Sequence, residues 1–363
     1  MIYRTLPGTN LDISVLGFGN FPFGADWWGR YKDDEAVAIQ DRAVDLGVNF
    51  FDSAPTYGDG RAERLLGRTI RNVGRDRLVI ATKYGYDIDN SNVSAGSHRE
   101  KRQDFSPAFI ERDLEASLKR LGIDCIDLYQ AHNLKLPQYT DDVAATMQKL
   151  VDKGRIRAWG VALGPAIGWR EEGYRALLDH DADVVQTVFN LYEQDPGREL
   201  CELCQRRQRG GVIARVPTNS GILDEEFTSA DHKFPAHDHR KFRDRNWLFY
   251  GLQKNEIIRP MAEHVGSSIR AFAFRWLLSH EHVVSIEPNL LSVEDVAAFA
   301  AAAEQGPLPA ALMRELGELY DRDFDLGEAA HPCDLKSSVA PGGSLRSAYE
   351  PLDWPVAVEV KGT

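Results

Sequence analysis

Apolar residues follow two alternating patterns along this chain. Short continuous apolar runs, such as residues 48–51, 78–82 and 125–129, are typical of strands that are buried on both faces. Longer segments lie between them, such as 33–46 and 107–121, in which apolar residues recur at the spacing of an amphipathic helix. The chain therefore alternates strand and helix over most of its length.

The pattern predicts eight strand–helix units. The expected strands cover residues 15–17, 48–51, 78–82, 125–129, 156–161, 184–188, 212–215 and 283–286, and a turn cluster at residues 7–10 predicts a hairpin over residues 1–13. The expected helices lie near residues 33–46, 61–71, 107–121, 141–153, 170–179, 197–208, 256–265, 267–279, 292–303 and 308–319. Such alternation builds a parallel sheet, and eight units close naturally into an α/β fold, the (β/α)8 TIM barrel.

A doubly wound open sheet is the alternative fold. It would use the turn after the first strand as a dinucleotide-binding fingerprint, which requires three glycines. Gly17 and Gly19 supply the first two, but Pro22 occupies the third position. The barrel is therefore preferred, with residues 1–320 forming the barrel and residues 321–363 a C-terminal extension that packs on it or is partly disordered. Long connections at residues 20–32, 84–105, 132–140 and 216–255 follow strand ends on one face, where they can surround a substrate cleft.

Composition narrows the class of protein and of partner. The 363 residues are 43% hydrophobic and 27% charged, the balance of a soluble globular protein. The net charge of −12 and the lack of a Lys/Arg-rich block argue against nucleic acid or an anionic membrane as partners. We expect no membrane span and no signal peptide, and four cysteines in so long a chain fit a reducing cytoplasm. The oligomeric state stays open.

Four residues with complementary chemistry stand where strands meet loops. Asp52 and Tyr57 follow the second strand, Lys83 the third and His132 the fourth. In a parallel barrel these ends share one face and neighbouring strands are about 5 Å apart, so Asp52 and Lys83 should touch, with the other two close by. Carbonyl reduction with a nicotinamide needs a proton donor. A Lys ammonium lowers the pKa of Tyr, an Asp keeps the Lys charged, and a His can orient the carbonyl.

These residues lie in motifs that resemble the aldo-keto reductase family. The motifs are FDSAPTYG with GRAERLLG, TKYG, DLYQAHN, VQTVFN and GVIARVPTNSGIL, and the likeness extends from about residue 3 to 320. The resemblance implies a catalytic tetrad of Asp52, Tyr57, Lys83 and His132, with substrate at Tyr57 and His132. It also implies a nicotinamide cofactor across the barrel mouth. The implied cofactor contacts are Gly19, Asn20 and Phe21 near the ribose, Asp52, Gln186 at the carboxamide, Arg215 at the ring, and Asn289, Ser292 and Asp295 after the eighth strand.

Departures from the family pattern bear on the choice of cofactor. Ala162-Leu163 replaces a common Ser-Asn pair, and Phe299 stands at the position of a common Asn. After the eighth strand the family commonly shows Ile-Pro-Gly or Ile-Pro-Lys and then a basic residue, whereas residues 287–295 here contain no Lys or Arg. A carboxylate such as Asp295 repels the 2′-phosphate of NADP(H) and can accept hydrogen bonds from a ribose hydroxyl. We therefore expect NAD(H) to be preferred over NADP(H), unless a cation of the long loop, Arg215, Lys233, Arg240, Lys241 or Arg243, binds that phosphate.

Three further signals are weaker. Trp27 and Trp28 either pack within their loop or form an aromatic platform for substrate. Cys201 and Cys204 have redox spacing, but ordinary packing within a helix is the expected role. A polar stretch of possible metal ligands matches no compact site, so no metal is predicted and a solvated or substrate-facing loop is expected; it contains Asp231, His232, His237, Asp238 and His239.

The leading hypothesis is an oxidoreductase that transfers a hydride between a nicotinamide cofactor and the carbonyl or alcohol of a small polar, sugar-like substrate. One alternative is a regulatory subunit that binds cofactor but turns over slowly, although the complete tetrad argues against it. The other is a redox-neutral enzyme that keeps NAD(H) tightly bound. Absorbance of bound reduced nicotinamide after purification would separate the latter from the leading hypothesis.

Overall fold

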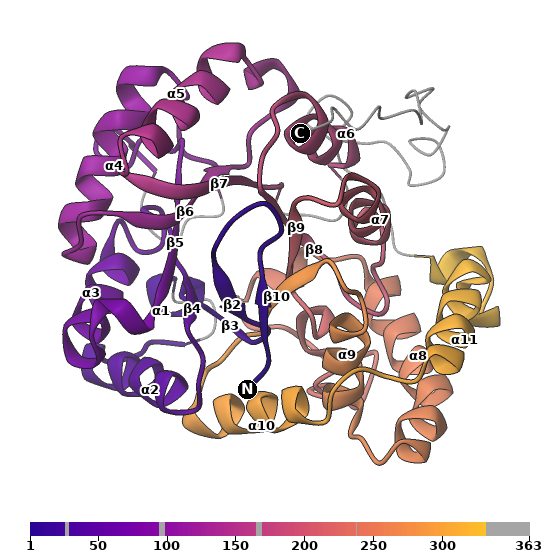
Figure 1. Ribbon diagram of the computed structural model, residues 1–363. Coiled ribbons are helices and arrows are strands. Elements are labelled where there is room, and N and C mark those ends of the chain that lie inside the picture. Colours follow the sequence, from indigo (N-terminus) through magenta and orange to yellow (C-terminus); the bar gives the residue numbers. More distant parts are fainter. Residues whose placement is uncertain (26–28, 94–98, 165–168, 237, 332–363) are drawn as a thin grey trace.

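Eight parallel strands form the predicted barrel (Figure 1). The computed structural model describes residues 1–25, 29–93, 99–164, 169–236 and 238–331. The barrel strands are β3 (Gly17–Gly19), β4 (Phe50–Asp52), β5 (Val79–Tyr84), β6 (Ile126–His132), β7 (Ile156–Ala162), β8 (Val184–Val188), β9 (Gly211–Arg215) and β10 (Val283–Glu287). They follow one another in chain order, and a parallel bridge from Leu16 to Ile286 joins the two ends of the sheet. The sheet is therefore nearly closed, and the doubly wound alternative is wrong.

Helices cover the outside of the barrel (Figure 1). They are α1 (Phe21–Gly24), α2 (Asp33–Asp45), α3 (Arg61–Val73), α4 (Pro107–Leu121), α5 (Asp141–Asp152), α6 (Arg170–Tyr174, continued by a π-helical turn at Arg175–Asp179), α7 (Gly197–Arg207), α8 (Arg245–His264), α9 (Ile269–Leu278), α10 (Val293–Glu304) and α11 (Ala310–Asp321). Helix α4 shows why its ends could be predicted from the sequence. Ser106 caps its N-terminus by accepting a hydrogen bond from the backbone of Phe109, and left-handed Gly122 ends it.

Strand register decides which side chains meet at the mouth of the barrel. All the predicted strand-end residues lie at the C-terminal ends of their strands, where active sites of this fold are built. The residues paired in register at this end are Gly19 with Asp52, Lys83 with Gln130, His132 with Ala162, Ala162 with Gln186, and Arg215 with Glu287.

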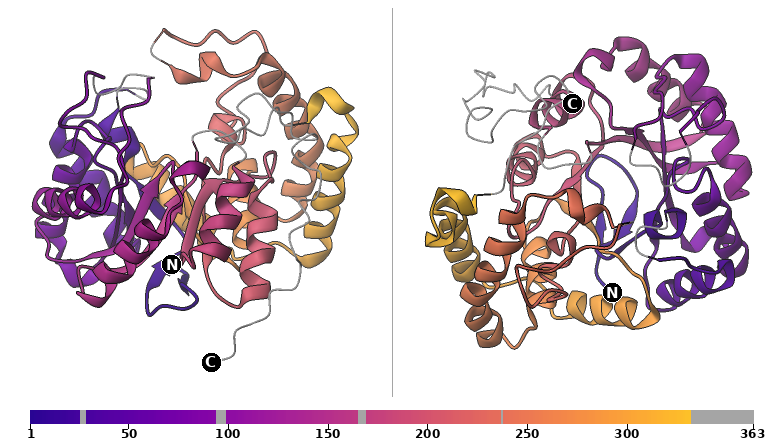
Figure 2. Two further views of the ribbon diagram at one scale, coloured as in Figure 1. Left: turned by 90° about the horizontal axis from the view of Figure 1, so that it is seen from above. Right: turned by 180° about the vertical axis from the view of Figure 1, so that it is seen from behind.

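The N-terminal hairpin closes the opposite end. Strands β1 (Tyr3–Thr5) and β2 (Asp12–Ser14) pair antiparallel around the predicted turn. Figure 2 shows this hairpin at the far end of the barrel from the long loop that follows β9. Leu6, Leu11 and Ile13 are buried in one cluster with side chains from the inner barrel, namely Phe50, Val79, Ala81, Leu128, Ala158, Val184, Ile213 and Val284. The barrel therefore has an apolar floor and a polar mouth.

Among the element boundaries that differ from the sequence prediction, two have a clear physical reason. The first barrel strand begins at Gly17, two residues later than its apolar run, because Val15 and Leu16 instead make single contacts with β10. Helix α8 begins at Arg245 rather than near residue 256, because Asp244 caps it by accepting a hydrogen bond from the Asn246 backbone. Aromatic residues and a glycine in its first half have low helix propensity and concealed this start. The long connection after β9 consequently ends at residue 244.

The C-terminal extension begins as packed structure. After α11, two short 3-10 turns follow at Asp323–Asp325 and Glu328–Ala330. Phe324 is buried edge-on against Tyr192, and Lys254 of α8 donates a hydrogen bond to the carbonyl of Ala330 at 2.6 Å. The rest of the extension lies outside the described residues, so the division of the chain at residue 320 stays a prediction.

Candidate active site

Lys83 connects the predicted catalytic residues. Its side chain is 1% exposed, and its Nζ donates to the carboxylate of Asp52, to the backbone carbonyl of Ser53 at 2.9 Å and to the Tyr57 hydroxyl at 3.1 Å. An ammonium has three N–H donors, so all of them are used. The other oxygen of Asp52 accepts a hydrogen bond from Gln130 Nε2 at 2.9 Å. This network holds a positive charge directly beside the Tyr57 hydroxyl.

A tight loop after β4 positions Tyr57. The backbone N–H of Tyr57 donates to the carbonyl of Ala54 at 3.1 Å. Gly58 has a φ of 67°, which residues with a side chain rarely adopt. Gly24 of α1 packs so closely that a Cβ there would lie 2.3 Å from the backbone carbon of Tyr57. The two glycines therefore allow α1 to hold this loop over the strand end.

His132 completes the group. It ends β6, and its ring meets the ring of Tyr57 edge to face at 6.0 Å between centroids and that of Tyr86 at 5.1 Å. Burial, helped by the charges of Lys83 and Arg215, lowers the pKa of His132 well below its usual value. The imidazole is therefore neutral at pH 7, a form that can hydrogen-bond a carbonyl oxygen. The structure thus brings Asp52, Tyr57, Lys83 and His132 together, while their catalytic roles stay predictions.

Burial changes the pKa of Tyr57 more strongly than the charge of Lys83 does. Burial is the largest influence and raises the pKa of Tyr57 above its usual value, while Lys83 lowers it in the predicted direction but by less. Burial likewise raises the pKa of Asp52, against the effect of Lys83. Burial would lower the pKa of Lys83, but Asp52, Tyr57 and Glu287 together raise it above its usual value. Lys83 consequently stays charged.

Two predicted cofactor contacts lie beside this network. Gln186 on β8 is buried, and its Nε2 donates to Oε2 of Glu287 at 3.1 Å. Arg215 ends β9 and donates to the backbone carbonyls of Leu163, at 3.1 Å, and Gly164. Both residues are therefore at the polar mouth, where a bound nicotinamide could reach them.

The turn after β3 is fastened to β4. The backbone N–H of Asn20 donates to the carbonyl of Asp52 at 2.8 Å, and its Nδ2 donates to the same oxygen at 2.9 Å. Its Oδ1 accepts a hydrogen bond from Gln40 at 2.7 Å, so the buried Asn20 side chain is fully engaged within the protein. Phe21 packs edge-on against Tyr57 at 5.0 Å between centroids. Contact of Gly19, Asn20 and Phe21 with a cofactor stays a prediction.

The segment after β10 meets a cation that the local sequence did not reveal. Ser292 caps α10, and its hydroxyl bonds both the backbone N–H and the carboxylate of Asp295 at 3.1 Å. Arg270 of α9 lies 3.3 Å from the Asp295 carboxylate and 2.7 Å from that of Asp224. Asn289 is exposed nearby in sequence. One guanidinium is therefore shared by two carboxylates, and this cluster keeps a net negative charge.

Sequence reasoning missed two polar residues of the site. Gln130 lies within the motif DLYQAHN, but its amide does not titrate and the motif predicted no role for it. Its side chain holds Asp52 in place by a hydrogen bond. Glu287 was noted only as a departure from the family pattern. It is 8% exposed, and its Oε1 has no hydrogen-bond partner among the described residues. Both occupy the C-terminal half of barrel strands, which is the signal that could have found them.

The structure describes only some of the residues that gave the weaker sequence signals. Trp27, Trp28 and His237 lie outside the described residues. Cys201 and Cys204 are buried free thiols on α7, and burial raises the pKa of both, which agrees with a packing role. Within the described ranges, no group of three or more His, Cys, Asp or Glu side chains could hold a metal ion. In the same part of the chain, no helix is both long and apolar enough to cross a membrane.

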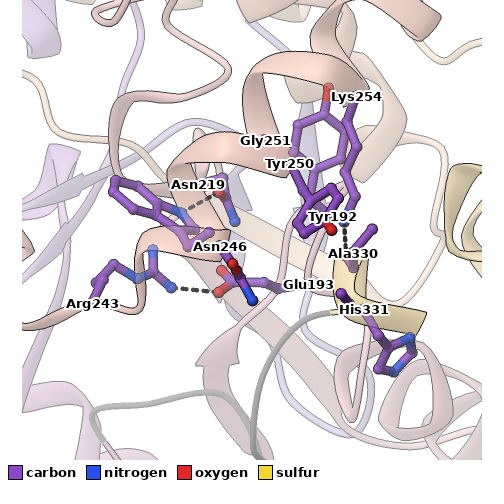
Figure 3. Close-up of a pocket in the computed structure, with 12 residues that line it drawn as sticks. Tyr192, Glu193, Asn219, Arg243, Asn246, Tyr250, Gly251, Lys254, Ala330 and His331 are labelled. Carbon is purple, nitrogen blue, oxygen red and sulfur yellow. Dashed lines mark hydrogen bonds and ion pairs between the residues drawn. The ribbon is translucent and has the colours of Figure 1, made fainter. Parts of the chain in front are cut away.

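A separate pocket lies between α8 and the start of the C-terminal extension (Figure 3). It encloses about 60 Å³. Within it, Arg243 pairs with Glu193, and Trp247 donates a hydrogen bond to Asn219 at 2.6 Å. None of the four tetrad residues lines this pocket, so it is distinct from the site at the barrel mouth.

Comparison with known proteins agrees with the geometry. Residues 15–321 match the model of the Aldo/keto reductase family. The NADH-specific methylglyoxal reductase of Escherichia coli is 26% identical over 86% of this chain and 98% of its own length. An aldo-keto reductase of Schizosaccharomyces pombe named with NADP(+) is 31% identical over 64% of this chain and 66% of its own length. The solved glycerol dehydrogenase of Gluconobacter oxydans superposes with a TM-score of 0.73 at 25% identity, over 92% of this chain and 97% of that one.

The chain therefore belongs to the aldo/keto reductase family. It is an oxidoreductase that interconverts carbonyl and alcohol groups with a nicotinamide cofactor.

The polar mouth suits such a cofactor. The nicotinamide carboxamide both donates and accepts hydrogen bonds. The mouth offers the Gln186 amide and Oε1 of Glu287, which has no hydrogen-bond partner among the described residues. Gly19 adds open backbone, since the nearest atoms to a Cβ there would be 3.8 Å away. Donors, acceptors and room are thus present on neighbouring strands.

Proposed function

We propose that this enzyme reduces small polar aldehydes or ketones, and oxidises the corresponding alcohols, with Tyr57 as the group that exchanges the proton. The observation that carries the proposal is the position of Lys83 Nζ, hydrogen-bonded to both Asp52 and the Tyr57 hydroxyl. Few structural roles require a buried ammonium against a tyrosine hydroxyl, whereas acid–base chemistry at that hydroxyl does.

Each member of the tetrad has one task in this mechanism. When bound, the reduced nicotinamide cofactor supplies the hydride to the carbonyl carbon. Tyr57 donates its proton to the carbonyl oxygen, and Lys83 stabilises the tyrosinate that remains. Neutral His132 hydrogen-bonds the carbonyl oxygen and orients it. Asp52 keeps Lys83 charged and aimed at Tyr57.

Small polar molecules are the proposed substrates. One relative is named for methylglyoxal and a similar solved structure for glycerol, and both compounds carry oxygens on neighbouring carbons. The mouth of this barrel is rich in polar side chains, which suits such compounds better than long apolar ones. Sugars and short polyols belong to the same chemical class.

NAD(H) is the proposed cofactor. The 2′-phosphate of NADP(H) carries nearly two negative charges and needs a cation that is free to bind it. Arg270, the cation beside Asp295, already forms ion pairs with Asp295 and Asp224. The named relatives include both an NADH-specific and an NADP(+) enzyme. The preference for NAD(H) is therefore inferred from the charges of this chain.

The test is the substitution Tyr57→Phe. It removes one oxygen, and we expect turnover of methylglyoxal with NADH to fall by roughly 10²–10⁴-fold with little change in NADH binding, since general acid catalysis contributes about that much. Tyr84→Phe is the matched control, because Tyr84 is also buried and its hydroxyl has no partner among the described residues. This control should keep nearly full turnover.

Near-normal turnover by the Tyr57→Phe enzyme would refute the proposed role of Tyr57. A wild-type protein that binds NADH but turns over no aldehyde, ketone or polyol in a broad screen would point instead to a cofactor-binding regulatory subunit. Reduced nicotinamide that stays bound through purification would favour the redox-neutral alternative.

A further inference from the structure

Glu287 is a buried carboxyl that the proposed mechanism does not use. It ends β10 in register with Arg215 of β9. Its Oε2 accepts the hydrogen bond from Gln186, whereas its buried Oε1 is without a partner among the described residues. An unpaired buried oxygen costs stability, so its presence in the site needs an explanation.

Gly17 of β3 makes room for this side chain, and Gly19 lies beside it. A Cβ at Gly17 would lie 3.0 Å from Cγ of Glu287, and a Cβ at Gly19 would lie 3.8 Å from its Oε2. The Gly17-Phe18-Gly19 segment, which fails as a dinucleotide fingerprint, therefore lets a carboxyl group approach the strand end predicted to contact the cofactor ribose. On its other side Glu287 bonds Gln186, the predicted carboxamide contact. Glu287 thus bonds one predicted contact at the nicotinamide end of the cofactor, Gln186, and lies close to the other, Gly19.

The charged groups that face Glu287 come from three other strands. Asp52 on β4 and Lys83 on β5 are already paired with each other. Arg215 on β9 donates hydrogen bonds to backbone carbonyls. Glu287 itself takes part in no salt bridge within the described residues, although Lys83 and Arg215 both act on it at longer range. The carboxyl group therefore has room for a positive partner that the protein does not provide.

We propose that this partner is the positive charge of the oxidised nicotinamide ring, so that Glu287 makes the site bind NAD+ more tightly than NADH. The inference rests on the proposed function and deepens it. During carbonyl reduction the hydride, with its electron pair, passes to the carbonyl carbon, and the Tyr57 proton passes to the oxygen. One positive charge is left on the ring, and a carboxylate beside it stabilises that charge as it develops. Glu287 thereby favours carbonyl reduction over alcohol oxidation at the bound cofactor.

Proton linkage gives a second signature. Burial, together with the negative charge of Asp52, raises the pKa of Glu287 well above its usual value. A positive charge bound beside the group lowers that pKa again. Over the pH range between these two pKa values, NAD+ binding should therefore release a proton and strengthen as pH rises, whereas NADH binding should do neither.

The experiment compares NAD+ and NADH binding by isothermal titration calorimetry in two buffers of different ionisation enthalpy. In Glu287→Gln we expect the preference for NAD+ over NADH to fall about ten-fold, within the roughly 5- to 150-fold range of coupling between bound species. The proton release on NAD+ binding should disappear. Glu287→Asp keeps a carboxyl and should retain the release. Asp113→Asn is the control and should behave as wild type. Asp113 lies on the outer helix α4 and is also buried, with one oxygen that has no hydrogen-bond partner in the described ranges.

Each outcome decides a different question. An unchanged preference in a folded Glu287→Gln protein would overturn the role of Glu287, while binding of both cofactors would leave the proposed function intact. Wild-type protein that releases no proton on binding NAD+ would overturn the inference even if the variant failed to fold. Wild-type protein that binds neither form would overturn the proposed function itself.

Discussion

Lys83 and Tyr57 are coupled through a single contact of 3.1 Å. In alcohol oxidation Tyr57 must act as a base, so the rate rises with pH through its pKa. Removing the ammonium in Lys83→Met raises that pKa further, and we expect the rising limb of the oxidation profile to move to higher pH, along with a slower rate. Steady-state rates across pH measure this.

Lys149→Met provides the control for that experiment. Lys149 pairs with Glu111 on the surface of the barrel, so its removal should leave the profile unmoved. If Lys83→Met lowers the rate uniformly without moving the limb, Lys83 acts only as a structural partner of Asp52.

For His132 we predict that no titration is seen near neutral pH. A free imidazole titrates near pH 6.5, but burial lowers the pKa of His132 well below that value. Its ring signals in an NMR titration should therefore stay constant between about pH 6 and pH 8. Assignment follows from the signals lost in His132→Gln, with free imidazole in the same buffer as reference. A His132 signal that moves through this range would mean that a charged imidazole faces the substrate.

At the scale of elements, we propose that the N-terminus of α10 and the facing side of α9 determine the choice between NAD(H) and NADP(H). Asp295→Asn keeps the capping contact with Ser292 but removes a charge and frees Arg270 from one partner. We expect the affinity for NADPH relative to NADH to rise about ten-fold, since like-charge contacts cost several kcal/mol. Fluorescence titration with both reduced cofactors measures the ratio.

Glu294→Gln is the control for this prediction, because Glu294 is exposed on the same turn of α10 and forms no ion pair with Arg270 in the described part of the chain. It should change the ratio far less than Asp295→Asn. Tighter binding of NADPH than NADH by the wild-type protein would show the proposed NAD(H) preference to be wrong.

The hairpin β1–β2 contributes stability rather than chemistry. Leu11 is 1% exposed in the apolar floor, so Leu11→Ala should lower the free energy of unfolding by about 2–5 kcal/mol. Urea unfolding measures this loss. Tyr3→Ala, on the same hairpin but 49% exposed, should cost much less. Loss of NADH binding in a folded Leu11→Ala protein would contradict the separation of floor and mouth.

At the scale of the whole molecule, the sequence sufficed for features that repeat locally. Each strand–helix unit carries its own apolar pattern, so eight units predicted the barrel. The rule that strand ends share one face then predicted the meeting of Asp52, Lys83, Tyr57 and His132.

Contacts between distant segments could not be predicted in this way. The pairing of Arg270 with Asp295 depends on how α9 packs beside α10, and the bond from Gln186 to Glu287 crosses between strands that are not neighbours. The room that Gly17 leaves for Glu287 appears only when the barrel closes. The partners in these contacts could not be predicted locally, because each contact depends on how distant segments pack together.

The apolar floor limits how the active site exchanges protons with water. The hairpin side chains of Leu6, Leu11 and Ile13, and the barrel residues that surround them, carry no acid or base. When substrate fills the mouth, no described side chain of the floor can return the proton that Tyr57 has given up. In the proposed mechanism, exchange of this proton with water therefore takes place by way of the mouth, the end of the barrel that also binds the substrate.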